Sequence, residues 1–65
     1  MTSPDQIRAL LSEADIGQRE AARLLKLRQI KVNEREFRNY CTGKIQCPEA
    51  TYLALQDLVN EISNA

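Results

Sequence analysis

The stretch Ile16–Lys44, IGQREAARLLKLRQIKVNEREFRNYCTGK, is the most informative part of the chain because it contains two short helical patterns joined by a bend. The patterns cover Gly17–Lys26 and Asn33–Thr42. Eight basic side chains against three acidic ones give this stretch a net charge of +5. The residues on both sides are net acidic, so the 65-residue chain sums to zero. A polyanion would be attracted to the middle of the chain, since phosphate contacts supply much of the affinity in nucleic-acid binding.

Length and composition predict one small domain spanning residues 1–65. A chain this short buries only about 60% of its unfolded surface, and 43% hydrophobic with 28% charged residues is ordinary for a globular protein. No apolar run is long enough to cross a bilayer and no signal-peptide core is present, so we expect a cytoplasmic protein. Cys41 and Cys47 are expected to be reduced, although a disulfide across the Gly43 turn stays open. Without histidine, two cysteines make a poor zinc site, so we expect no metal and no cofactor.

Apolar spacing and capping residues predict helices throughout and no strand. Ser3 caps a first helix over Pro4–Ala14 and takes part in a capping box. A second helix starts after Gly17 and ends near Leu27, and an extended turn follows to Val32.

The remaining two helices have clear start signals. Asn33 caps the third helix, with Glu36 as its capping-box partner, and Gly43 fits a left-handed cap at the other end. Pro48 opens the fourth helix, which runs to about Ile62. The expected fold class is therefore all-α, a compact bundle of four to five helices with a helix-turn-helix motif made by the second and third helices.

The outward face of the third helix carries the side chains that we expect to read DNA bases. Phe37, Tyr40 and Cys41 form its apolar stripe, so the opposite side meets the solvent. A recognition helix offers its outward N-terminal residues to base edges in the major groove. The expected base contacts are Glu34, Arg35, Arg38 and Asn39.

These four residues differ in the role that their chemistry predicts. Arg35 is the first candidate, because an arginine can fork onto O6 and N7 of guanine. Glu34 either accepts a hydrogen bond from cytosine N4 or holds Arg38 as an i, i+4 ion pair. Asn39 can read adenine, but its distance from the start of the helix favours a phosphate contact.

A second set of side chains is expected to contact phosphates, which sets register without reading sequence. Those at the start of the second helix lie beside free backbone amides, which favour phosphate. The set comprises Gln18, Arg19, Arg28, Gln29, Lys31 and Lys44. The alternative for each lysine and arginine of the set is a solvated surface charge. Arg23 and Lys26 are expected to face solvent, with an ion pair to Glu20 available to Arg23.

The fourth helix carries more apolar side chains than one face of a small core can bury, which favours a subunit interface. A two-fold dimer would also supply a second DNA half-site about one helical turn away. The expected interface residues are Tyr52, Leu53, Leu55 and Val59. The alternative is that the helix closes a thin core from several sides.

Two segments resemble the Cro/C1/Xre-type helix-turn-helix regulators. The first is IRALLSEADIGQREAARLL over Ile7–Leu25, with Gln18 opening the second helix and the small pair Ala21 and Ala22 within it. The second is VNEREFRNY over Val32–Tyr40, which is similar to the recognition helix. Within that class the chain looks most like the small phage regulators known as anti-CRISPR-associated repressors. The resemblance implies a lambda-repressor-like fold, a homodimer, and repression at an inverted-repeat operator of an anti-CRISPR operon in a bacterial host cell.

Other function classes receive less support from the residues. We expect no enzymatic activity, because the chain has no histidine, no glycine-rich phosphate loop and no plausible nucleophile–base pair. Mixed charges on the polar faces of the helices argue against a membrane surface. The expected partners are therefore double-stranded DNA and a second copy of the chain, with no small-molecule substrate. The alternative function is a helix-turn-helix protein-interaction module, an adaptor or antitoxin-like partner, which the zero net charge favours.

Overall fold

The computed structural model describes residues 3–64, and this part of the chain forms four α-helices and no strand. The helices are α1 (Pro4–Ala14), α2 (Gln18–Leu27), α3 (Glu34–Thr42) and α4 (Glu49–Ser63). They confirm the all-α fold class expected from the sequence. Residues 1, 2 and 65 of the expected domain lie outside the described part. No helix in residues 3–64 has the length and apolar character needed to cross a membrane.

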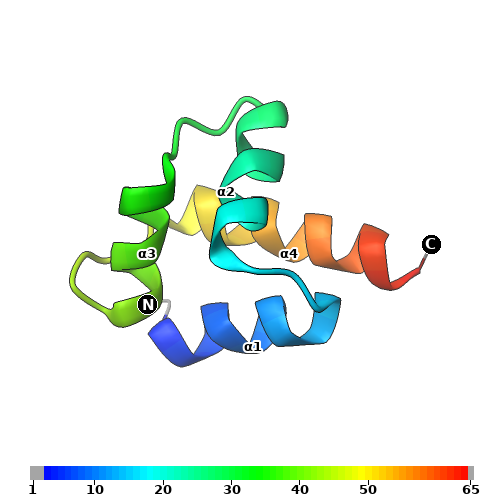
Figure 1. Ribbon diagram of the computed structural model, residues 1–65, viewed down its shortest axis with the longest axis horizontal. Helices are drawn as coiled ribbons and strands as arrows, with labels where there is room; N and C mark the ends of the chain where they lie inside the picture. Colours follow the sequence, from blue (N-terminus) through cyan, green and yellow to red (C-terminus); the bar gives the residue numbers. More distant parts are fainter. Residues whose placement is uncertain (1–2, 65) are drawn as a thin grey trace.

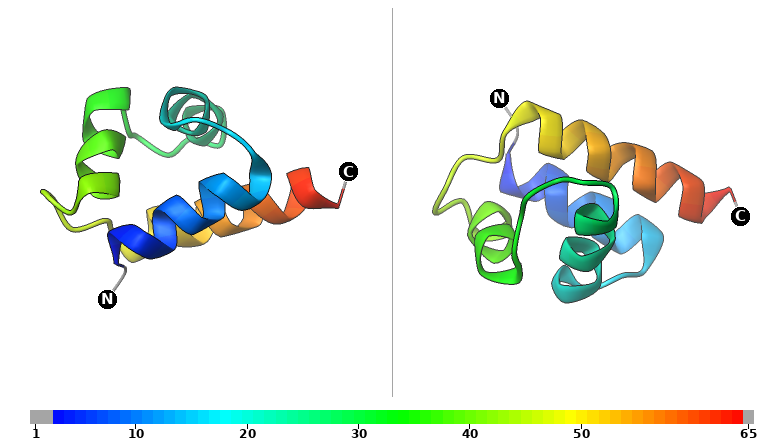
Figure 2. Two further views of the ribbon diagram at one scale, coloured as in Figure 1. Left: turned by 60° about the horizontal axis from the view of Figure 1, so that its bottom comes forward. Right: turned by 90° about the horizontal axis from the view of Figure 1, so that it is seen from above.

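The helices form two pairs. α1 and α4 lie side by side and run in the same direction, and α2 and α3 pack against one side of that pair (Figures 1 and 2). α3 lies near the end where α1 and α4 begin (Figure 1). α2 and α3 also contact each other and cross at a steep angle in the left view of Figure 2.

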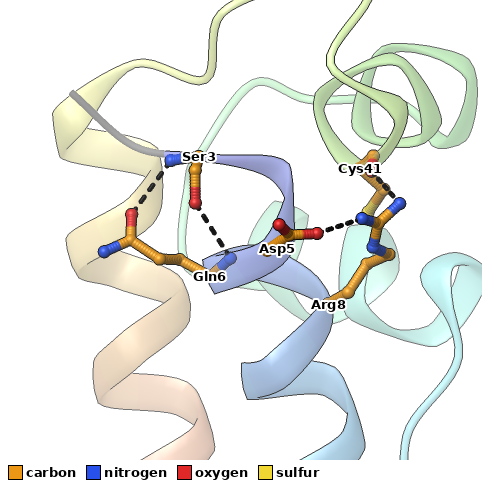
Figure 3. Close-up of polar contacts among 5 residues, drawn as sticks. All are labelled: Ser3, Asp5, Gln6, Arg8 and Cys41. Carbon is orange, nitrogen blue, oxygen red and sulfur yellow. Dashed lines mark hydrogen bonds and ion pairs between the residues drawn. The ribbon is translucent and has the colours of Figure 1, made fainter.

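Side-chain hydrogen bonds explain where two helices begin. Ser3 Oγ accepts from the Gln6 amide at 3.3 Å and Gln6 Oε1 accepts from the Ser3 amide at 2.9 Å, which confirms the capping box of α1 (Figure 3). Asn33 Oδ1 accepts from the Glu36 amide at 2.8 Å and so caps α3. The expected start of the fourth helix is wrong by one residue. Pro48 keeps an extended ψ of 145° and serves as the N-cap of α4.

Three helices end in the same left-handed turn. The left-handed residues are Asp15, Gln29 and Gly43, with φ angles of 56°, 67° and 84°. In each turn, the amide that follows the left-handed residue donates to the carbonyl five residues earlier, at 3.1, 3.0 and 3.0 Å. Only the turn at Gly43 is expected from the sequence. The turn at residues 28 and 29 shortens the expected extended segment, and the Val32 amide donates to the Ile30 carbonyl at 2.9 Å, which closes a tight three-residue turn.

One core joins all four helices. Phe37 is fully buried and meets the Tyr40 ring edge to face, with 6.5 Å between ring centroids and an interplanar angle of 75°. Leu55 and Val59 are 1% and 0% exposed, so the expectation that they lie on a dimer interface is wrong. They are one turn apart on α4, whose inner face packs against both α1 and α2.

A polar contact ties α1 to the last turn of α3. Arg8 donates from Nη1 to the Cys41 carbonyl oxygen at 3.2 Å and forms an ion pair with Asp5 (Figure 3). Carbonyl groups at the carboxyl end of a helix are unpaired and carry partial negative charge, so a guanidinium there is favourable. The sequence pattern assigns no role to Arg8, because the contact depends on how α1 and α3 pack.

Candidate nucleic-acid interface

A stripe of basic side chains follows the outward face of α2. Arg19, Arg23 and Lys26 are exposed, and their spacing of four and three residues places them on one side of the helix. Together with Asn33 and Glu34 they line a depression of about 200 Å³ between α2 and the beginning of α3. The solvent-facing side of α2 is therefore continuous with the first turn of α3.

Two further depressions extend this surface. One, of about 410 Å³, runs along α3 and is lined by Asn33, Glu34, Arg35 and Arg38. The other, of about 400 Å³, lies at the turn between the helices, where Lys26 and Asn33 again contribute to the lining. Since Asn33 lines all three depressions, they meet at the start of α3.

We call this the α2–α3 surface and define it by the polar and charged side chains that line the three depressions. They are Arg19, Arg23, Lys26, Gln29, Lys31, Asn33, Glu34, Arg35, Glu36 and Arg38. Six of the ten are basic and two are acidic, so the surface is net positive, although the whole chain is neutral.

Most of this positive charge has no internal partner. Within residues 3–64, ion pairs engage three arginines: Arg8 with Asp5, Arg28 with Glu61, and Arg38 with Glu34. The basic side chains of the α2–α3 surface without a carboxylate partner among the described residues are Arg19, Arg23, Lys26, Lys31 and Arg35. Five cations held on one face of a small domain form a site that attracts phosphate groups.

The structure brings three of the four expected base-reading residues together. Glu34, Arg35 and Arg38 are exposed on the outward face of α3. Arg38 Nη2 lies 3.6 Å from Glu34 Oε1, which is the i, i+4 pair that the sequence leaves open. Asn39 is half-buried, and its carbonyl accepts from the Lys44 amide at 3.0 Å in the turn that ends α3. Its side chain does not line the three depressions.

The expected phosphate contacts separate into two groups. Arg19, Gln29 and Lys31 lie on the α2–α3 surface, whereas Gln18 and Lys44 do not line its depressions. Arg28 is also outside the lining, because it forms an ion pair with Glu61 in the last turns of α4. This pair links α2 to α4.

The expected contacts do not include Arg23 and Lys26. Both are exposed, as expected, and they line the same depression as Arg19. A signal was present in their spacing, because residues four and seven positions after Arg19 lie on its side of a helix. The ion pair that Glu20 could offer to Arg23 is not among those of the described residues.

The two thiols lie inside the domain and not on this surface. Cys41 and Cys47 are free and buried, and burial raises the pKa of both thiols above the ordinary value of 9.0. For Cys41, the charge of Arg8 offsets part of that effect on the pKa. Both thiols are therefore protonated at neutral pH, in the state in which cysteine is least reactive.

A separate, less charged surface includes the first half of α4. Leu53 is 50% exposed, Tyr52 is half-buried, and both line a depression of about 560 Å³ beside Cys47 and Pro48. Ile45, in the loop before α4, is another exposed large apolar side chain. Of the four expected interface residues, Tyr52 and Leu53 thus remain available to a second molecule.

Comparisons of the chain with protein-family models, with curated proteins and with solved structures find no match. The chain presents two contacting helices, a connection over residues 28–33, and a positive surface that continues from one helix to the other.

Proposed function

We propose that this chain is a sequence-specific DNA-binding protein in which α2 and α3 form a helix-turn-helix unit. The observation that carries the proposal is the α2–α3 surface, where five cations without internal partners surround the start of α3. DNA binding neutralises phosphates with such side chains and releases their counterions. α3 enters the major groove with its outward side toward the base edges.

The residues divide between positioning and reading. Arg19, Arg23 and Lys26 contact phosphates from α2 and set the register, with Lys31 doing the same from the turn. Arg35 reads bases, because it is exposed near the start of α3 and has no carboxylate partner among the described residues. A guanidinium in this position can donate two hydrogen bonds to guanine.

The DNA-bound form that we propose is a homodimer on an inverted repeat. A domain of this size reads only a few base pairs, so a second protomer supplies the second half-site. Tyr52 and Leu53 on α4 provide the apolar side chains for the contact. A dimer that covers a promoter represses transcription by occupancy, which fits a cytoplasmic phage regulator of the kind that the sequence resembles.

Salt dependence tests this proposal. Binding to a labelled duplex of random sequence is titrated by fluorescence anisotropy at several salt concentrations. Neutralisation of four phosphates by each bound protomer predicts a slope of log K against log salt of about −3.6 per protomer. Binding that is absent, or that does not change with salt, contradicts DNA recognition.

Two matched variants test whether the α2–α3 surface causes the salt dependence of DNA binding. Arg23→Gln removes a cation from the α2–α3 surface, whereas Arg28→Gln removes one that is paired with Glu61. We expect Arg23→Gln to reduce the slope by about 0.9 and Arg28→Gln to leave it nearly unchanged. Equal changes would place the DNA elsewhere on the molecule.

A second candidate function is a protein-interaction module. The observation that favours it is Leu27 at the end of α2, which is 76% exposed and the most exposed of the large apolar side chains. An apolar contact of this kind depends little on salt, so the same titration separates the two candidates.

A further inference from the structure

One acidic side chain lies at the centre of the positive surface. Glu34 lines both the depression shared with α2 and the depression along α3, and no other carboxylate in residues 3–64 lines both. Its side chain is 47% exposed, so it faces any molecule bound there. The basic residues of α2 lie on one side of it and Arg35 and Arg38 on the other.

Glu34 is not required to hold the helix together. Asn33 caps α3, and Glu36 provides a second acidic residue in its first turn. The ion pair of Glu34 with Arg38 spans 3.6 Å between exposed groups, a kind of pair that adds little stability. Because the stability of α3 does not explain the position of Glu34, we look for its role in what binds the α2–α3 surface.

A carboxylate in a DNA interface is favourable with only some sequences. It can accept a hydrogen bond from the exocyclic amine of cytosine or adenine in the major groove. A carboxylate is repelled by a base edge that offers only acceptors and by any nearby phosphate. In both cases it also loses its hydration without gaining a hydrogen bond. Its main effect is then to weaken binding to the wrong duplex.

We propose that Glu34 is a specificity-determining residue that acts by rejection, an inference that rests on the proposed DNA-binding function. Its carboxylate disfavours duplexes that present no amine donor to it. Glu34 thus lowers affinity for random DNA more than for the preferred site.

The test compares two duplexes of equal length, at one salt concentration. One is the sequence that the wild-type protein enriches from a random library, and the other is an unenriched pool. We expect Glu34→Gln to raise affinity for the pool about tenfold and to lower the ratio of the two affinities by at least that factor. Glu34→Asp keeps the charge and is expected to restore rejection of the pool.

Asp57→Asn is the matched control for net charge. Asp57 is exposed on α4, outside the α2–α3 surface, and its replacement removes the same single negative charge. We expect it to change both affinities by the same small factor. If Glu34→Gln behaves like Asp57→Asn, or if the affinity ratio is unchanged, the rejection role is wrong while DNA binding stands. If the wild-type protein enriches no sequence and binds no duplex, the proposed function itself fails.

Discussion

Gly43 lies so close to Pro4 that a Cβ atom on Gly43 would stand 2.9 Å from Pro4 Cγ. Gly43 also has a φ of 84°, in the left-handed region that side chains disfavour. The close approach places the end of α3 against the first turn of α1, and Arg8 reinforces the same junction through the Cys41 carbonyl. This junction sets the position of α3, and hence of Arg35, relative to the rest of the domain.

Gly43→Ala should therefore destabilise the protein by about 1–2 kcal/mol through left-handed strain, with a further loss from the clash with Pro4. Denaturant unfolding measures the change. The double variant Pro4→Ala/Gly43→Ala should recover the part due to the clash. Gly17→Ser is the control, because a Cβ at Gly17 meets nothing within 4 Å and a serine can cap α2. A double variant that is no more stable than Gly43→Ala would show that the Pro4 contact is unimportant.

The left-handed residue at the end of α1 offers a stabilising change. Asp15 has a φ of 56° and places a carboxylate beside the negative end of the helix dipole. Asp15→Gly should stabilise the protein by about 0.5–1 kcal/mol, after the greater flexibility of glycine in the unfolded chain is subtracted. Asp15→Asn removes only the charge and should gain less. If the Asp15→Gly protein has a lower thermal midpoint than the wild type, the left-handed conformation of Asp15 is not strained.

Two leucines on α4 should respond in opposite ways. Leu53 is 50% exposed, so Leu53→Glu should leave the fold intact and abolish self-association in analytical ultracentrifugation. Leu55 is 1% exposed, so Leu55→Ala should cost about 2–5 kcal/mol of folding free energy. If the Leu53→Glu protein still forms dimers, this part of α4 does not belong to the proposed interface.

Base reading and phosphate binding should separate in two variants of the α2–α3 surface. Arg35→Ala should cost about 1–3 kcal/mol on the enriched sequence and relax selection at one base pair. Lys31→Ala should weaken all duplexes by a similar factor and lower the salt slope by about 1. Affinities of both variants for single-base variants of the site provide the measurement. Uniform weakening by Arg35→Ala would mean that α3 does not read bases through this residue.

Stability should fall at alkaline pH. Burial raises the pKa of Cys41 and Cys47 above 9.0 and that of Tyr40 above 10.0. As pH rises, the unfolded chain loses these protons before the folded one, so their contribution is complete below about pH 9 and is lost above it. Thermal midpoints between pH 7 and pH 10.5 should show the decline, and Cys47→Ala should make it shallower. If Cys47→Ala leaves the alkaline decline of the thermal midpoint unchanged, groups other than Cys47 cause that decline.

Features that depend on neighbouring residues could be predicted from the sequence, and features that depend on packing could not. Ser3 and Asn33 identify helix starts because a capping side chain bonds an amide three residues away. The turn at Gln29 gives no signal, because glycine normally marks such a position and glutamine occupies it here. Leu55 and Val59 are assigned to an interface because sequence spacing does not tell which neighbour covers an apolar face.

The candidate site divides in the same way. Arg35 and Arg38 can be placed on the outward face of α3 because the buried positions of Phe37 and Tyr40 determine the opposite side. The ion pair that engages Arg28 away from the α2–α3 surface could not be predicted, because its partner Glu61 lies on a helix far along the chain. The spacing of Lys26 from Arg19 places it on the same side of α2, but the depression that it shares with Asn33 depends on how α2 and α3 pack.

Selection of duplexes from a random library by the purified protein, followed by the stoichiometry of the enriched complex, would establish whether the protein reads DNA sequence. We expect an inverted repeat with half-sites about one helical turn apart, bound by two protomers and weakened by salt. A library that shows no enriched motif, or weak binding that is equal for every sequence, would contradict a sequence-specific DNA-binding protein.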